Sequence, residues 1–133
     1  MRFVLDASVT INWAMRDEAN PISDRAFSAL RSGSAVVPGI WWYEVRNILV
    51  VNERRQRITP ADSNRFLLDL QELDIATDND PDSQAVLDLS RRLSRTVHDA
   101  AYLAVALRER VPLATLDKSL EAAAITEGIP LLA

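Results

Sequence analysis

Short apolar runs alternate with longer amphipathic stretches along the whole chain. The first run, Phe3–Leu5, contains a β-branched residue and leads at once into a stretch with helical spacing, which is typical of a buried parallel strand followed by a helix. Strands that alternate with helices indicate an α/β fold with a parallel sheet and helices on both faces. The pattern predicts further strands over 35–37, 73–76, 112–116 and 128–132, and helices over 8–15, 21–30, 41–54, 60–73, 81–93, 97–110 and 118–127.

The length and composition describe one ordinary globular domain. The 133 residues are 48% hydrophobic and 26% charged, and we expect a single domain over residues 1–133. The longest apolar run, Ala100–Leu107, has eight residues, whereas a helix needs roughly 20 to cross a bilayer. The first strand begins too early to leave room for a signal peptide, and the sequence has no cysteine. We therefore expect a cytoplasmic protein without a membrane segment.

The charge balance argues against binding of nucleic acid through overall charge. The 15 basic and 19 acidic residues give a net charge of -4. A cleft that gathers acids around a metal ion, with arginines on its rim, remains compatible with this balance, because the planar guanidinium suits phosphate. Arginines cluster at Arg54, Arg55 and Arg57, at Arg91, Arg92 and Arg95, and at Arg108 and Arg110.

Two acids follow predicted strands directly. Asp6 ends the first strand, and Asp117 repeats this position after 113–116. In open α/β sheets ligands bind outside the carboxyl ends of the strands, so both side chains point to one candidate site. An alternative for Asp117 is an ordinary helix N-cap. Ser8 also has two interpretations, as a helix cap or as a hydroxyl beside Asp6 that holds a metal-bound water.

Two more acids occupy unusual positions on predicted helices. Glu44 lies at the edge of an apolar stripe rather than on the polar face, beside Ile48. Asp99 lies within the apolar stripe of its helix, three and four residues before Tyr102 and Leu103. A buried, unpaired carboxylate is costly, so this position calls for a cation or a hydrogen-bond donor. The alternative is that Asp99 complements the helix dipole in the first turn.

Convergence of these four acids at one end of a parallel sheet would require divalent cations. Like charges about 4 Å apart repel by roughly 4 kcal/mol at an effective dielectric constant of about 20. Hard oxygen ligands of this kind select Mg²⁺ or Mn²⁺. A metal ion held by carboxylates can activate water for attack on a phosphodiester, although similar clusters also serve phosphatases and other metal hydrolases.

Four segments of the sequence resemble the motif blocks of PIN-domain proteins, most closely the VapC-type ribonuclease toxins of toxin–antitoxin systems. The segments are Val-Leu-Asp-Ala-Ser-Val (4–9), Val-Val-Pro-Gly-Ile-Trp-Trp-Tyr-Glu-Val-Arg-Asn-Ile-Leu (36–49), Thr-Val-His-Asp-Ala-Ala-Tyr-Leu-Ala-Val-Ala (96–106) and Leu-Ala-Thr-Leu-Asp-Lys-Ser-Leu (113–120). The resemblance implies a three-layer α/β/α sandwich with a mostly parallel five-stranded sheet. It also implies a Mg²⁺- or Mn²⁺-dependent endoribonuclease, a VapB-like antitoxin as partner, and a homodimer.

The same resemblance assigns roles to individual residues. Asp6 and Asp99 correspond to the principal metal ligands. Glu44 and Asp117 correspond to the remaining acids, which bind metal directly or through water and help to orient the attacking water. Ser8 and Thr115 correspond to hydroxyls that support the metal ligands.

Two alternative functions are compatible with parts of the pattern. One is a PIN nuclease that processes RNA without an antitoxin. The other is a response-regulator-like signalling module, in which an acidic pocket accepts phosphate. That module usually has two adjacent acids after the first strand and a phosphoacceptor after the third, and this sequence has neither.

Overall fold

The computed structural model describes residues 1–15 and 17–133 and contains a four-stranded sheet. The order of the strands is β3-β2-β1-β4, and each of the three strand pairs is parallel. This arrangement confirms the predicted α/β fold with a parallel sheet. The strands are β1 (Arg2–Leu5), β2 (Ser34–Pro38), β3 (Ile75–Asp78) and β4 (Leu113–Ala114).

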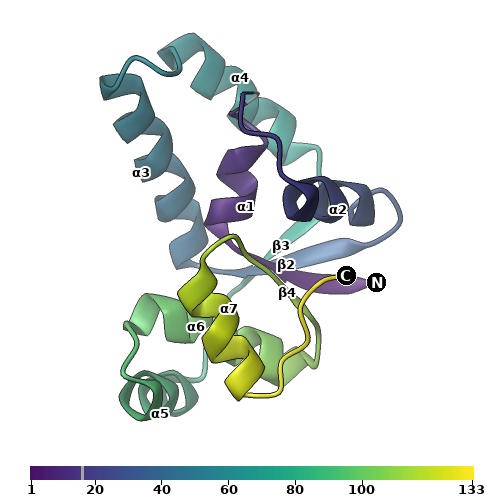
Figure 1. The fold of residues 1–133 in the computed structure, drawn as a ribbon, viewed down its shortest axis with the longest axis vertical. Helices are drawn as coiled ribbons and strands as arrows, with labels where there is room; N and C mark the ends of the chain where they lie inside the picture. The colour runs from purple at the N-terminus through teal and green to yellow at the C-terminus, as the bar shows by residue number, and fades with distance from the viewer. Residues whose placement is uncertain (16) are drawn as a thin grey trace.

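Helices cover both faces of this sheet. Figure 1 shows α1 to α4 above the strands and α5 to α7 below them. The helices are α1 (Ala7–Asn12), α2 (Pro21–Ala29), α3 (Ile40–Arg54), α4 (Pro60–Gln71), α5 (Ser83–Leu93), α6 (Val97–Glu109) and α7 (Lys118–Thr126). Among the described residues, no helix is long and apolar enough to pass through a bilayer.

The prediction of a fifth strand over 128–132 is wrong. Only Leu131 pairs with the sheet, through an isolated parallel bridge to Leu113. Pro130 has no N–H to donate to a ladder, which limits pairing of this segment. The third strand also begins two residues later than predicted, because Leu73 closes a turn after α4 and its carbonyl accepts from the Ile75 N–H.

The central strand β1 explains why Asp6 is buried. Phe3, Val4 and Leu5 are fully buried, as expected for a strand covered by helices on both faces. Burial of each such side chain contributes about 1.5–3 kcal/mol of hydrophobic free energy. Because Leu5 is the last residue of this strand, Asp6 is held at the boundary of a rigid core.

The direction in which the chain adds strands to the sheet reverses between β1 and β4. The chain passes from β1 to β2 and β3 on one side, and β4 pairs with β1 on the other. Leu5 lies opposite Ala114 in this pair, so the residues that follow the two strands are neighbours. Such a switch point is where open α/β sheets bind their ligands.

Candidate active site

Asp6 lies at the carboxyl end of β1 and is the most buried of the four candidate acids, with 7% of its surface exposed. Its Oδ2 atom accepts two short hydrogen bonds, from Ser8 Oγ and from Thr115 Oγ1, each 2.7 Å long. One donor follows β1 and the other follows β4. The switch point of the sheet therefore brings together three of the predicted site residues.

The two hydroxyls are oriented by the backbone of the loop after β4. Ser8 Oγ accepts from the Leu116 N–H at 3.0 Å, and Thr115 Oγ1 accepts from the Asp117 N–H at 3.0 Å. Because each oxygen already accepts a backbone N–H, its own proton is available to donate to Asp6. Ser8 therefore supports Asp6 and makes no side-chain cap on α1.

The position of Asp6 opposes its ionisation. Burial raises the pKa of this carboxyl above its usual range, and the charge of Asp117 raises it further. The hydrogen bonds from Ser8 and Thr115 lower the pKa, but they do not outweigh burial. Asp6 makes no ion pair among the described residues, so its negative charge is uncompensated in the protein alone.

Glu44 faces the same region from α3 and is bound by a buried tyrosine. Tyr102 Oη donates to Glu44 Oε1 at 2.6 Å, and Tyr102 is 1% exposed. The pKa of Glu44 is raised, first by burial and then by the charges of Asp6 and Asp99, whereas the tyrosine bond and His98 lower it. The pKa of Tyr102 lies far above its ordinary value, mainly because of burial, so its hydroxyl remains a donor.

This role of Tyr102 is not predicted by the sequence pattern, in which Tyr102 is only a member of the apolar stripe of α6. The available signal was a phenol at a core position, since a buried tyrosine hydroxyl requires a partner. The partner is 58 residues away in the sequence, so only the folded chain identifies it.

The entry of α3 is fixed by a second buried contact. Trp41 Nε1 donates to Thr10 Oγ1 at 3.0 Å, and Thr10 Oγ1 in turn donates to the Asp6 carbonyl at 3.2 Å. Thr10 is fully buried, and Trp41 is 6% exposed. These contacts tie the first turn of α3 to α1, and so position Glu44 relative to Asp6.

Asp99 lies in the first turn of α6 and is partly exposed rather than buried. Its backbone N–H is capped by Thr96 Oγ1 at 3.1 Å. Its Oδ2 atom accepts from Arg95 Nη2 at 2.7 Å. Asp99 therefore lies where it complements the N-terminus of α6, and its carboxylate is paired with the guanidinium of Arg95.

Asp117 caps α7, as its alternative interpretation predicted. Its Oδ1 atom accepts from the backbone N–H groups of Ser119 at 2.9 Å and Leu120 at 3.3 Å. It is exposed, and these bonds together with the Ser119 hydroxyl lower its pKa. Asp117 therefore stays ionised and contributes a fixed negative charge near Asp6.

The four acids form one electrostatic group, although they do not form a closed metal cage. Asp117 raises the pKa of Asp6, and both Asp6 and Asp99 raise that of Glu44. Within residues 1–15 and 17–133, no three carboxylates or histidines lie close enough together to hold a metal ion as the side chains stand. The donor set nevertheless fits a divalent ion, because it consists of four carboxylates, of which only Asp99 makes an ion pair among the described residues. The side chains would have to converge to bind one.

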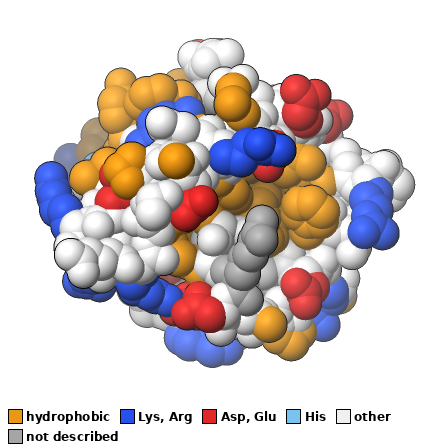
Figure 2. Space-filling view, turned by 90° about the horizontal axis from the view of Figure 1, so that it is seen from above, with side chains coloured by type: hydrophobic (Ala, Val, Ile, Leu, Met, Phe, Trp, Pro, Cys, Tyr) orange, Lys and Arg blue, Asp and Glu red, His pale blue; other side chains and the backbone are white. Residues whose placement is uncertain are grey.

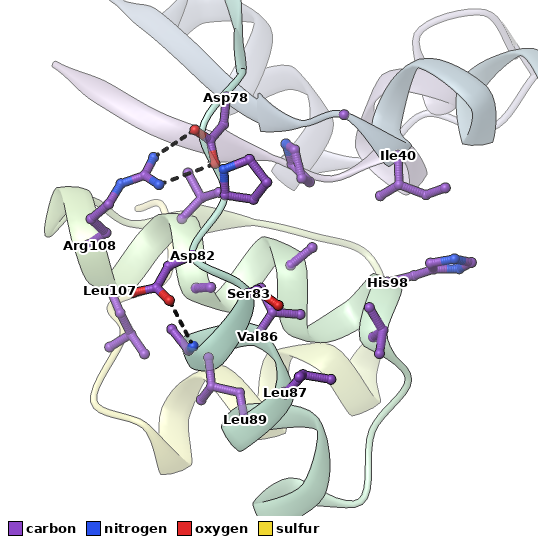
Figure 3. Close-up of a pocket in the computed structure, with 18 residues that line it drawn as sticks. Ile40, Asp78, Asp82, Ser83, Val86, Leu87, Leu89, His98, Leu107 and Arg108 are labelled. Carbon is purple, nitrogen blue, oxygen red and sulfur yellow. Dashed lines mark hydrogen bonds and ion pairs between the residues drawn. The ribbon is translucent and has the colours of Figure 1, made fainter.

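A separate cavity of about 660 Å³ lies between α5, α6 and the ends of β2 and β3. Figure 3 shows that the Asp78–Arg108 ion pair borders it at one end and that His98, at the start of α6, borders it at the other. Its remaining lining is mostly apolar, and none of the four acids contributes to it. Two of its acids have structural partners, because Asp78 pairs with Arg108 and Asp82 caps α5 by accepting from the Ala85 N–H. The candidate site therefore remains the carboxylate group at the switch point.

The surface around the upper helical layer carries charges of both signs. Figure 2 shows acidic and basic side chains interspersed around a hollow lined by hydrophobic side chains. This mixture agrees with the net charge of -4 and gives this face no broad basic field. A polyanionic substrate that approached this face would therefore meet individual cationic side chains and no continuous basic surface.

The fold is similar to that of a solved archaeal protein. The crystal structure of PAE2754 from Pyrobaculum aerophilum superposes with a TM-score of 0.73 at 23% sequence identity, covering 92% of this chain and 84% of that chain. No protein of curated function matches the sequence. The structural likeness therefore supports the fold and leaves the chemistry to be argued from the site.

A family comparison extends over almost the whole sequence. The family model described as PIN domain matches residues 3–126, which include all four acids. PIN domains are a superfamily that generally consists of nucleases; they act on RNA and generally use divalent metal ions. Because the match covers far more than half of the sequence, this chain belongs to the PIN domain family.

Proposed function

We propose that this chain is a Mg²⁺- or Mn²⁺-dependent endoribonuclease whose site consists of Asp6, Glu44, Asp99 and Asp117. The observation that carries the proposal is the buried Asp6 carboxylate, which two oriented hydroxyls hold at the switch point beside three further acids. Such a group has a surplus of negative charge that a divalent cation would neutralise. Membership of a nuclease superfamily supports the same chemistry.

Each residue has a distinct role in this proposal. Asp6 and Asp99 would be the principal metal ligands, and Ser8 and Thr115 would hold the Asp6 carboxylate in position. Glu44, which Tyr102 orients, and Asp117 would hold the attacking water. The bound metal ion supplies the activation of water and the neutralisation of charge on the phosphodiester.

We further propose that the chain is a single PIN domain of the VapC type. In this proposal it is the toxin of a toxin–antitoxin system, acts in the cytoplasm as a homodimer, and is inhibited by a VapB-like antitoxin. The support is the order and spacing of the four motif blocks at 4–9, 36–49, 96–106 and 113–120.

Sequencing of RNA 5′ ends after brief expression tests the proposed activity. Expression of the wild type should generate discrete new 5′ ends, whereas the Asp6→Asn variant should generate none. If the wild type generates no new ends despite being folded and bound to metal, the ribonuclease assignment is wrong. Co-expression of the gene next to that of the toxin should suppress the new ends if it encodes the antitoxin.

A further inference from the structure

Arg95 contacts Asp99 of the candidate site and has no role in the proposed mechanism. It lies in the short connection between α5 and α6, next to Ser94, which adopts the left-handed conformation with φ of 53°. The Arg95 N–H donates to the Ser90 carbonyl at 3.0 Å, and the Arg95 carbonyl accepts from Ser90 Oγ at 2.6 Å. The backbone of Arg95 is therefore fixed on both sides.

The guanidinium of Arg95 links two of the four acids. Its Nη2 atom donates to Asp99 Oδ2 at 2.7 Å and to Ser119 Oγ at 2.8 Å. Ser119 Oγ donates in turn to Asp117 Oδ1 at 2.7 Å. The side chains of Arg95 and Asp99 are 21% and 26% exposed, so water screens this ion pair only in part. Arg95 also lowers the pKa of Asp117.

The guanidinium of Arg95 does not engage all of its N–H donors. Nη2 serves both acceptors, whereas Nε is buried and has no hydrogen-bond partner among the described residues. A bidentate pair would engage two nitrogen atoms with the two carboxylate oxygens. A buried donor without an acceptor carries a desolvation cost. The pair therefore leaves one buried donor of the guanidinium unsatisfied.

We propose that Arg95 is the built-in counter-ion of the metal-free site, which a divalent cation must displace from Asp99. Arg95 thereby sets the metal affinity of the centre. This inference rests on the proposed function, because it takes Asp99 as a metal ligand. Asp99 Oδ2 cannot serve a guanidinium and a metal ion equally, and the positive charge of Arg95 opposes the approach of a second cation.

Calorimetric titration with Mn²⁺ tests this competition. We expect the Arg95→Gln variant to bind Mn²⁺ about fivefold more tightly than the wild type, which corresponds to the upper range for a partly exposed ion pair. Arg95→Lys keeps the charge and should remain within about twofold of the wild type. The control is Arg65→Gln, which removes another arginine with an i,i+4 partner, Asp69, far from the acids, and should leave the affinity unchanged.

NMR of the wild-type protein gives a second readout that requires no destabilising variant. The Nε–H signal of Arg95, identified by its loss in Arg95→Lys, should shift on addition of Mg²⁺, because the guanidinium leaves Asp99. The Nε–H signal of Arg65 should not move. A purely structural role for Arg95 would leave both signals in place.

The outcomes separate this inference from the proposed function. If wild type and Arg95→Gln bind Mn²⁺ equally, or if the Arg95 signal is unmoved while Mn²⁺ binds, Arg95 is not the displaced counter-ion, although the metal site stands. If neither protein binds Mn²⁺, the inference and the metal-dependent function are both wrong. Tighter binding by Arg95→Gln together with a moving Arg95 signal supports both.

Discussion

At the residue scale, the ionised Asp6 carboxylate lowers the free energy of unfolding, because the contacts within the protein do not compensate for its burial. Its pKa is raised by burial, so the ionised form is disfavoured in the folded state relative to the unfolded chain. Because the pKa of Asp6 is higher in the folded protein than the value of 3.8 in the unfolded chain, protonation of Asp6 stabilises the fold. This stabilisation is fully present below pH 3.8 and is lost as the pH rises through the pKa of Asp6 in the folded protein. The metal-free protein therefore loses stability over that window.

The Asp6→Asn variant should melt at a higher temperature than the wild type at pH 7 in the presence of a chelator. Asparagine removes the buried charge and keeps an oxygen for Ser8 and Thr115 to donate to. Each kcal/mol gained in the free energy of unfolding should raise Tm by about 4 °C in a domain of this size. The difference should shrink as the pH falls through the raised pKa of Asp6, because the protonated carboxyl carries no charge. A difference that does not depend on pH would show that the charge of Asp6 is not its cause.

The Tyr102→Phe variant should reduce both stability and activity. It removes the donor to Glu44 Oε1, and hydrogen bonds to charged groups contribute about 1.5–3 kcal/mol. It should also raise the pKa of Glu44 further, because that bond lowers it. Urea unfolding and the pH profile of cleavage measure the two effects. Tyr43→Phe is the matched control, since Tyr43 is 66% exposed, and an equal effect in that variant would contradict the assignment.

At the element scale, periodicity predicts most of the fold. The run Phe3–Leu5 and the amphipathic helices are found close to their predicted bounds, because alternation and helical spacing report burial directly. The edge of the sheet was predicted poorly. Residues 128–132 look like a strand in composition, but their pairing depends on a long-range partner and on a proline, and only Leu131 bridges.

The candidate site shows the same division between local and long-range information. The position of Asp6 follows from the end of β1, which is a local feature of the sequence. The strand predicted over 112–116 comprises only Leu113–Ala114, so Asp117 does not end a strand and is instead placed by the start of α7.

The contacts of Glu44 with Tyr102, and of Arg95 with Ser119, join residues 58 and 24 positions apart. No spacing rule relates such pairs. The resemblance named the acids together with Ser8 and Thr115, which donate to Asp6, whereas the contacts of Tyr102 and Arg95 were not predicted.

The Thr10→Val variant tests how α1 and α3 position the site. It leaves Trp41 Nε1 as a buried donor without its acceptor, which costs about 1–3 kcal/mol. The first turn of α3 should then shift and carry Glu44 with it, so that cleavage falls about tenfold although Thr10 touches none of the candidate carboxylates. Thr126→Val, on the exposed face of α7, should change neither stability nor cleavage. Full activity in Thr10→Val would mean that α3 is positioned by other contacts.

At the scale of the whole molecule, the net charge of -4 limits how RNA can be bound. The face in Figure 2 has mixed charges, and a net negative charge repels phosphates, so we expect few phosphate contacts and a weak dependence of binding on salt. We expect the slope of log K against log salt to be no steeper than about -2 for a single-stranded oligonucleotide, which corresponds to roughly three phosphate contacts. Fluorescence anisotropy with the inactive Asp6→Asn variant measures it. A slope near -5 would reveal an extended basic surface.

The most direct test of the account is cleavage of RNA by the purified protein as the divalent metal concentration is varied. The account predicts no cleavage in excess EDTA, recovery on addition of Mg²⁺ or Mn²⁺, and no cleavage by Asp6→Asn or Asp99→Asn at any metal concentration while both remain folded. Cleavage that persists in EDTA, or near-normal cleavage by both variants, would contradict a metal-dependent site built on these acids.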